Sequence, residues 1–160
     1  MDTDFARQQM VDQQVRAWEV LDPGVLQVLK DVPREQFVPT GYEALAFADT
    51  AIPIGHGEEM MTPTLEGRVL QALNPGSGDK ILEVGTGTGF LAACFARLAA
   101  SVTSIDIHED LLERARVNLE DTGIDNVSLH KRHAPKDLPN EKNQHEPVSG
   151  SFMHIDKRFY

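Results

Sequence analysis

Three glycines at alternate positions, Gly85, Gly87 and Gly89, follow a short apolar run that contains Glu83, and a helical pattern begins directly after them. A strand, a glycine turn and a helix in this order let a nucleotide-like ligand approach bare main chain at a helix N-terminus. Asp106 closes a second apolar run, VTSID. An acid in that place can accept hydrogen bonds from both hydroxyls of a ribose. The pattern therefore predicts a site for a ribose-bearing ligand.

The glycine spacing indicates which ligand would fit. A pyrophosphate-binding turn has the pattern G-x-G-x-x-G, whereas this chain has G-x-G-x-G with Glu83 two residues before the first glycine. A carboxylate there would repel a pyrophosphate but suits the amine and sulfonium of S-adenosyl-L-methionine. The pattern resembles motif I of the Rossmann-like methyltransferases. The alternative is a tight strand-to-helix turn that binds no ligand.

Alternating strand and helix patterns would position this motif. We expect strands at 80–84, 102–107 and 126–130, and helices at 90–99 and 109–121. Strands that alternate with helices of this length predict a parallel sheet with right-handed crossovers. The fold class is therefore α/β.

The first half of the chain is predicted to be mainly helical. We expect helices at 4–21, 23–32, 41–48 and 63–73, the first with an apolar side marked by Phe5, Met10, Val11, Val15, Trp18 and Val20. Between the last two, TAIPIGHGEEMMTP is rich in Gly and Pro and predicts a loop that presents side chains to a ligand. Within one domain we distinguish residues 1–75 as helices and substrate loop, 76–130 as cofactor-binding strand–helix units, and 131–160 as an atypical tail.

Composition excludes several classes of function. The 160 residues are 41% apolar and 25% charged, as in a soluble globular domain. A net charge of −10 argues against nucleic-acid and anionic-membrane binding, because phosphate neutralisation needs a basic surface. Cys94 is the one cysteine, so we expect a small core residue rather than a disulfide or a nucleophile. No apolar run is long enough to span a bilayer, and the polar N-terminus predicts a cytoplasmic protein.

Several longer motifs resemble those of the protein-L-isoaspartate O-methyltransferases. They are MVDQQVRAWEVLDPGVLQVL, VPREQFVP, PIGHG, ILEVGTGTGF and SIDI, which occur in the order of that family and cover about residues 10–130. The resemblance implies an S-adenosyl-L-methionine-dependent enzyme that methylates the free carboxylate of isoaspartyl residues in damaged proteins or peptides.

The resemblance also implies roles for individual residues. The cofactor-binding residues would be Glu83, Gly85, Thr86, Gly87, Gly89, Asp106 and Ile107. The substrate loop would include Ile54, Gly55, Gly57 and Met61, with Thr62 and His56 as catalytic candidates. His130, His133, His145 and His154 match no ordinary zinc spacing, so we expect solvated histidines and no metal site.

Two departures from the family pattern leave alternatives open. Met61 lies where the family commonly has a serine at the reaction centre; Thr62 could supply a hydroxyl instead, or could only cap the next helix. After residue 130 the net charge changes from −12 to +2 and strand–helix alternation stops, so the sheet is expected to be incomplete. The sequence SFMHID could add a fourth strand. An incomplete sheet favours a homo-oligomer or strand exchange.

Three functions remain open at this point. A carboxylate acceptor is already ionised at neutral pH, so methyl transfer needs no general base and depends on positioning and on exclusion of water. The first hypothesis is therefore isoaspartyl methyl transfer, with a different acceptor as a variant of it. The alternatives are a truncated module that binds S-adenosyl-L-methionine without catalysis, and a silent fragment that binds no ligand.

Overall fold

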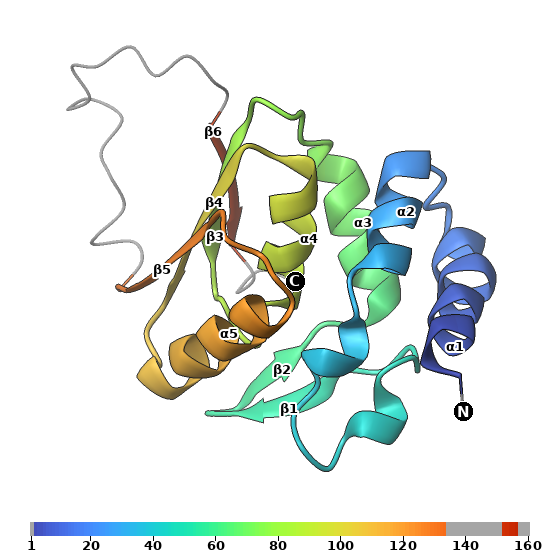
Figure 1. Cartoon of the computed structure of the whole chain (residues 1–160), viewed down its shortest axis with the longest axis horizontal. Helices are drawn as coiled ribbons and strands as arrows, with labels where there is room; N and C mark the ends of the chain where they lie inside the picture. The colour runs from blue at the N-terminus through green and yellow to red at the C-terminus, as the bar shows by residue number, and fades with distance from the viewer. Residues whose placement is uncertain (1, 134–151, 157–160) are drawn as a thin grey trace.

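The structure is a computed structural model that describes residues 2–133 and 152–156 of the 160-residue chain. Within these residues a four-stranded sheet lies at one side, and the helices form successive layers beside it (Figure 1). The N-terminal helices form the layer farthest from the sheet. The chain is therefore an α/β protein with an N-terminal helical extension, as predicted.

The sheet consists of parallel strands in the order β5-β4-β3-β6. The bounds are Lys80–Val84 for β3, Ser101–Asp106 for β4, Val127–Lys131 for β5 and Phe152–Asp156 for β6. The first three strands are confirmed with ends that shift by at most one residue, and the fourth strand suggested by SFMHID is confirmed beside β3. The described sheet is thus one strand larger than the alternation alone predicted.

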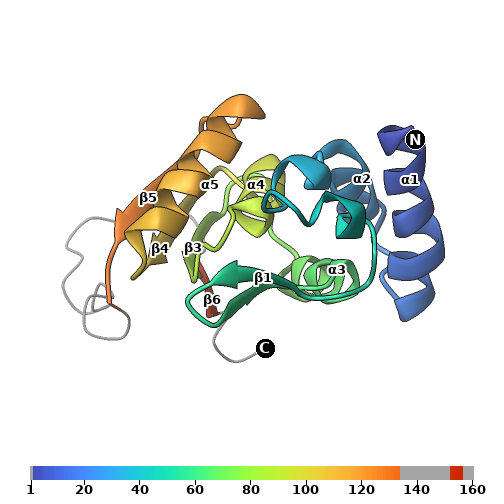
Figure 2. The ribbon, with the colours of Figure 1, turned by 90° about the horizontal axis from the view of Figure 1, so that it is seen from below.

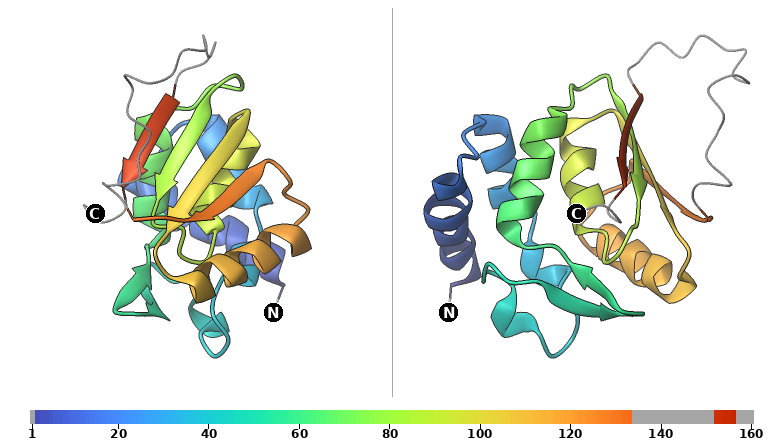
Figure 3. Two further views of the ribbon diagram at one scale, coloured as in Figure 1. Left: turned by 90° about the vertical axis from the view of Figure 1, so that its left-hand side faces the viewer. Right: turned by 180° about the vertical axis from the view of Figure 1, so that it is seen from behind.

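Helices cover one face of this sheet in two layers. Helices α4 (Phe90–Leu98) and α5 (Glu109–Asp121) contact the strands, and α2 (Pro23–Asp31) and α3 (Pro63–Leu73) pack on α4 (Figure 2). In the part of the chain that the structure describes, no helix lies on the opposite face (Figure 3). Because α4 lies between the sheet and two helices, most of its side chains are buried.

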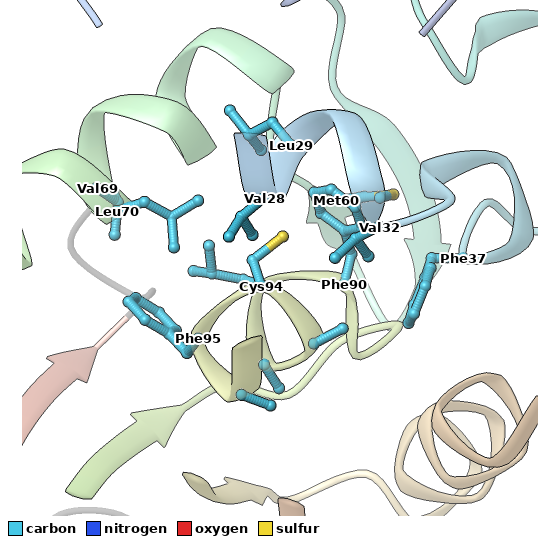
Figure 4. Packing of buried hydrophobic residues seen from close by; sticks show 14 of the residues in the cluster. Val28, Leu29, Val32, Phe37, Met60, Val69, Leu70, Phe90, Cys94 and Phe95 are labelled. Carbon is cyan, nitrogen blue, oxygen red and sulfur yellow. The ribbon is translucent and has the colours of Figure 1, made fainter. Parts of the chain in front are cut away.

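The main hydrophobic core lies between α4 and the N-terminal helices. Cys94 of α4 is fully buried there, and its side chain points toward Val28 of α2 (Figure 4). Phe90 and Phe37 pack edge to face with ring centroids 5.5 Å apart. The prediction that Cys94 is a core residue is confirmed, and the packing fixes the start of α4, where the glycine motif ends.

The first predicted helix, 4–21, is only partly right. The structure has α1 (Thr3–Gln9), a π-helical segment (Met10–Val15) and a 3-10 turn (Arg16–Trp18), and Glu19 ends them at φ 65°. Four of the predicted apolar residues are buried, but Phe5 and Trp18 are each 60% exposed. The π-helical turns after α1 depart from the regular 3.6-residue repeat on which the apolar pattern was based.

The helix starts at α2 and α3 are confirmed, and each helix has a side-chain cap. Asp22 accepts a hydrogen bond from the Val25 amide at 3.0 Å, and Thr62 accepts one from the Leu65 amide at 3.3 Å. The helix predicted at 41–48 is wrong in extent, since only Glu43–Leu45 forms a 3-10 turn.

The segment predicted as a loop at 50–63 forms a β-hairpin. Strands β1 (Ile52–Gly55) and β2 (Glu58–Met60) are antiparallel, with Gly55 opposite Glu58. The two turn residues, His56 and Gly57, have φ values of 58° and 72°. Positive φ at both positions is what a two-residue type I′ turn requires. The sequence signal was present, since Ile52 and Ile54 alternate with exposed positions before the His-Gly pair, but the Gly and Pro content masked it.

Candidate functional site

The glycine motif connects β3 to α4 at the carboxyl end of the sheet. Gly85, Gly87 and Gly89 have φ values of 95°, 55° and 90°, which strain any residue with a Cβ atom. The Gly85 amide donates to the Ile105 carbonyl at 2.8 Å, so the loop is anchored to β4. Gly89 caps α4, and a Cβ atom there would lie 3.1 Å from the Cβ of Ala115 on α5. The turn therefore needs glycine for conformation and for close packing.

A buried network of hydrogen-bonded side chains supports this loop. Glu83 is fully buried, and its Oε1 accepts a hydrogen bond from the Ser104 hydroxyl at 2.6 Å. The Thr86 and Ser104 hydroxyls lie 2.7 Å apart and also share a hydrogen bond. Since Glu83 and Ser104 are register neighbours on β3 and β4, the strand pairing itself aligns these two groups, and Thr86 joins them from the loop. This hydrogen-bond network fixes the position of the first half of the glycine loop.

The carboxylate of Asp106 lies beside the same loop. Its Oδ2 accepts a hydrogen bond from the Gly87 amide at 3.2 Å, and its Oδ1 accepts one from the His108 amide at 2.9 Å. The side chain is buried, with 8% exposure for the residue. Each carboxylate oxygen has further lone pairs, so Asp106 can still accept hydrogen bonds from a ligand.

A cavity of about 390 Å³ opens at this end of the sheet. This volume lies within the 300–1,000 Å³ that ligand pockets usually have. Of the predicted site residues, the cavity wall contains Ile54, Gly57, Met61, Thr62, Gly85, Thr86, Gly87, Asp106 and Ile107. The structure thus brings the glycine loop, the acid at the end of β4 and much of the hairpin segment to one cavity.

Four predicted site residues are not part of that wall. Glu83 lies beneath the loop, Gly89 packs against α5, and Gly55 and His56 lie at the hairpin tip. Direct contact of these four with a ligand remains a prediction. Their observed places indicate support of the wall rather than contact with what it encloses.

The hairpin forms the wall opposite the glycine loop. A Cβ atom at Gly87 would lie 3.3 Å from Cδ1 of Ile54, so Ile54 sits close above the loop. Met61 and Thr62 follow β2 at the root of the hairpin and face the same cavity. The predicted capping role of Thr62 is confirmed, because its hydroxyl accepts from the Leu65 amide. A catalytic role for that hydroxyl stays a prediction.

Proteins of one known family resemble this chain over the residues that form the cavity. A sequence model of the family described as Protein-L-isoaspartate(D-aspartate) O-methyltransferase (PCMT) matches residues 6–137. The chain belongs to this family. The PCMT match includes both the hairpin segment and the glycine motif, so it covers both walls of the cavity.

Curated relatives agree with that assignment. The chain is 37% identical over 139 residues to "Protein-L-isoaspartate O-methyltransferase 1" of Rhodopseudomonas palustris, covering 86% of this chain and 57% of the relative. It is 41% identical over 129 residues to the protein of that name in Koribacter versatilis, covering 79% of this chain and 58% of the relative. The chain therefore spans a little over half the length of the curated PCMT relatives it matches.

Solved structures share the fold. A chain described as a protein-L-isoaspartate O-methyltransferase of Plasmodium falciparum, in complex with S-adenosyl-L-homocysteine, superposes with a TM-score of 0.68 at 19% identity, covering 85% of this chain and 66% of that chain. Another structure named protein-L-isoaspartate O-methyltransferase gives 0.66 at 23% identity, covering 77% of this chain and 41% of that chain. The Rossmann-like methyltransferase fold is thereby established for this PCMT chain.

Sequence reasoning missed a buried ion pair that fixes the root of the hairpin. Arg34 is fully buried and lies 3.2 Å from the Glu66 carboxylate. Its guanidinium also donates to the carbonyls of Ala46 and Met61, at 2.7 and 2.8 Å, and lies 5.3 Å from the Phe90 ring centroid. Arg34 belongs to the VPREQFVP motif, and its place in that motif was the available signal.

Arg132 and His133, at the end of β5, also line the cavity and were not predicted as site residues. The Arg132 amide donates to the Asp106 carbonyl at 3.1 Å, which extends the β4–β5 pairing by one residue. Neither residue belongs to a motif of the PCMT family that the sequence revealed, so only the sheet register brings them to the site.

The hairpin tip meets α5 through charged and aromatic side chains. His56 Nε2 lies 2.8 and 2.9 Å from the two carboxylate oxygens of Asp110, and the His56 and His108 rings stack with centroids 3.8 Å apart. The hydrogen bond from His56, followed by its charge, lowers the pKa of Asp110 from its ordinary value of 3.8. Asp110 is therefore an ionised acceptor at neutral pH, and Nε2 of His56 carries the shared hydrogen.

Two features are absent from the described residues. Within residues 2–133 and 152–156, no helix is long and apolar enough to cross a membrane. In the same residues, no group of three or more histidine, cysteine or acidic side chains could hold a metal ion. Of the four histidines considered for a metal site, His145 lies outside the described residues.

Proposed function

We propose that this chain binds S-adenosyl-L-methionine in the cavity and transfers its methyl group to the carboxylate of an isoaspartyl residue in a damaged protein or peptide. The observation that carries the proposal is the open cavity between the glycine loop and Asp106 on one side and the hairpin on the other, in a PCMT-family chain. The S-adenosyl-L-homocysteine complex of the Plasmodium falciparum protein supports the same ligand class.

The residues present fit an adenosine-bearing ligand. Gly85 and Gly87 present main chain without side chains to the cavity, and a Cβ atom at Gly87 would narrow the gap to Ile54. Asp106 holds its carboxylate at the cavity wall through two backbone hydrogen bonds, so its orientation is set before a ligand arrives. Two ribose hydroxyls can donate to that carboxylate.

The sulfonium of the donor would supply an activated methyl group. Everything else in the reaction is positioning, since a carboxylate acceptor is ionised at neutral pH and needs no base. Good alignment and exclusion of water can contribute about 7–11 kcal/mol to catalysis. A cavity built from main chain, one acid and a hairpin suits this chemistry better than a set of acid–base side chains would.

The acceptor side supports a second candidate: donor binding without isoaspartyl methylation, or transfer to a different acceptor. Met61 faces the cavity where the family resemblance leads us to expect a serine. The Thr62 hydroxyl is used as the cap of α3. These two observations weaken the claim of an isoaspartyl acceptor while leaving the donor site unchanged.

The expected setting and partners rest on sequence and topology. A net charge of −10 supports a protein acceptor rather than nucleic acid or an anionic membrane surface. One cysteine, Cys94, buried in the core, is in keeping with a cytoplasmic location. In the described sheet β5 and β6 are the edge strands, and pairing of one of them with a second copy or another segment would extend the sheet.

Two measurements test the proposal. Titration calorimetry with S-adenosyl-L-methionine should show binding, and mass spectrometry should show methylation of an isoaspartyl peptide but not of the same peptide with an ordinary aspartate. Binding without methylation at high enzyme concentration would favour the second candidate. A folded protein that does not bind the donor would overturn both.

A further inference from the structure

The contact of His56 with α5 joins the two walls of the cavity. His56 lies at the tip of the hairpin that contributes Ile54 and Gly57 to one wall. Asp110 lies in the first turn of α5, just after Ile107 of the other wall. In Figures 1 and 3 the hairpin tip points at the start of α5. The pair therefore bridges the mouth of the cavity at the end farthest from the hairpin's root.

Three side chains take part in this bridge. The Nε2–H of His56 is shared between both oxygens of Asp110, at 2.8 and 2.9 Å, and the His108 ring stacks on His56 at an interplanar angle of 12°. The side chains of His56 and Asp110 are 38% and 60% exposed. The cavity wall includes none of the three, so they can act on a ligand only through the position of the hairpin.

We propose that His56, His108 and Asp110 form a clasp that holds the β1–β2 hairpin closed over the cavity, and that donor affinity depends on this clasp. The three are positioning residues. The root of the hairpin is fixed by the buried Arg34 contact with the Met61 carbonyl, whereas the tip has this exposed contact. Opening would therefore begin at the tip. The effect of the clasp on donor affinity rests on the proposed function, but the closing of the hairpin by the clasp does not.

The expected effect is bounded by the exposure of the pair. Exposed ion pairs shift an equilibrium by up to about fivefold, so loss of the clasp should raise the open fraction of the hairpin by up to about that factor. The apparent dissociation constant of a donor that binds only the closed form varies inversely with the closed fraction. Donor affinity should therefore fall by no more than the same factor.

His56→Asn distinguishes the contact of His56 with Asp110 from the role of His56 in the hairpin turn. Asparagine tolerates positive φ, and Asn-Gly is a preferred type I′ pair, so this change keeps or strengthens the turn. Its shorter side chain cannot reach Asp110. If His56 served only to form the turn, hydrogen exchange of the hairpin amides would slow or stay the same. With a clasp, exchange of the amides in residues 52–60 becomes faster, by up to about fivefold.

Three further variants complete the test in the full chain without ligand. They are Asp110→Asn, Asp110→Glu and the double variant Asp110→Asn/His56→Asn. Asp110→Asn should match His56→Asn, the double variant should add little to either, and Asp110→Glu should restore part of the protection. Glu113→Gln is the control, since Glu113 has a similar exposure on the same helix and pairs with Arg116 instead. Additive effects, no rescue, or unchanged hairpin exchange in both single variants would overturn the clasp.

Calorimetry with S-adenosyl-L-methionine completes the comparison. Donor affinity weaker by up to about fivefold in both single variants, and unchanged in Glu113→Gln, would support the link between clasp and donor. Faster hairpin exchange with unchanged affinity would overturn that link. If the unaltered chain binds no donor, the proposed function fails, while the exchange data still decide whether the clasp exists.

Discussion

The two walls of the cavity are built in different ways. The glycine-loop wall is fixed by strand pairing, by a buried network of hydrogen-bonded side chains and by glycines with positive φ. Its supporting side chains, such as Glu83 and Ser104, are fully buried. The hairpin wall is fixed at its root by Arg34 and at its tip by the exposed His56–Asp110 pair. The wall that we propose for the donor is therefore built largely from main chain, whereas the wall that we propose for the acceptor depends on side chains that can vary.

The largest expected effect is at the root of the hairpin. Arg34→Met leaves the buried Glu66 carboxylate without the charge of Arg34, and breaking a buried pair in this way costs about 3–5 kcal/mol. Urea denaturation should show that loss of stability. The double variant Arg34→Met/Glu66→Leu should recover part of it, because the buried charge is then removed too. A loss below about 1 kcal/mol in the single variant would show that solvent or another group compensates Glu66.

A somewhat smaller loss is expected in the glycine wall. Gly89→Ala places a Cβ atom 3.1 Å from the Ala115 side chain and 3.4 Å from its Cα, at a φ of 90°. Conformational strain and crowding together should destabilise the fold by about 3 kcal/mol in urea denaturation. Gly123→Ala has positive φ but open space around it, so it should cost only about 1 kcal/mol. Equal costs would show that α5 yields at Ala115.

The ligand-facing part of that wall is tested by Asp106→Asn. Hydrogen bonds to a charged group contribute about 1.5–3 kcal/mol, so loss of the carboxylate should weaken S-adenosyl-L-methionine binding by about 10- to 100-fold in calorimetry. Asp79→Asn is the matched control, because Asp79 also accepts a hydrogen bond from a loop amide but lies at the other end of β3. Unchanged affinity in Asp106→Asn would remove Asp106 from the donor site.

The contrast between the walls also explains what the sequence could predict. Strand and helix patterns predicted β3, β4, α5 and the start of α4, because the buried strands form apolar runs and α5 repeats apolar residues along its one buried side. The acid at the end of β4 and the glycines were found by spacing alone, and Asp106, Gly85 and Gly87 line one cavity. Local requirements of the main chain can therefore be predicted from residue types and their spacing.

Contacts between distant segments cannot be predicted in this way. Arg34 meets Met61, and His56 meets Asp110, across 27 and 54 residues of chain. The π-helical turns after α1 and the hairpin at His56–Gly57 were missed because each breaks the simple repeat or composition rule that was applied. Parts of the hairpin wall that depend on such contacts needed the structure.

A smaller effect is expected on the acceptor side with Met61→Ser. A hydroxyl at this cavity position could form one hydrogen bond to an acceptor carboxylate, and one bond changes a rate by about two- to tenfold. Methylation of an isoaspartyl peptide should rise by that factor, measured by mass spectrometry at saturating donor. Met61→Ala opens the same space without a hydroxyl and should give no gain. Equal gains in both variants would indicate that the size of the side chain, rather than a hydroxyl, limits the acceptor.

The smallest expected effect is a pH dependence of the hairpin tip. His56 lowers the pKa of Asp110 below its ordinary value of 3.8. Since the folded-state pKa is depressed, the stabilising contribution is complete above that ordinary value and is lost as pH falls through the lowered one. The ratio of hairpin protection between the unaltered chain and Asp110→Asn should therefore be largest above the ordinary pKa of Asp110 and approach one as the pH falls through the lowered pKa.

The acid at Glu113 provides the comparison that isolates this effect. Its pKa is also lowered, by the hydrogen bond and charge of Arg116, and it lies on the same helix with similar exposure. Glu113→Gln should leave hairpin protection unchanged at every pH, after correction for the intrinsic exchange rate. If both acids gave the same pH profile, general loosening of α5 would account for it. A pH profile seen with Asp110→Asn but not with Glu113→Gln would assign the pH dependence to the contact with His56, because Asp110, unlike Glu113, joins the helix to the opposite wall.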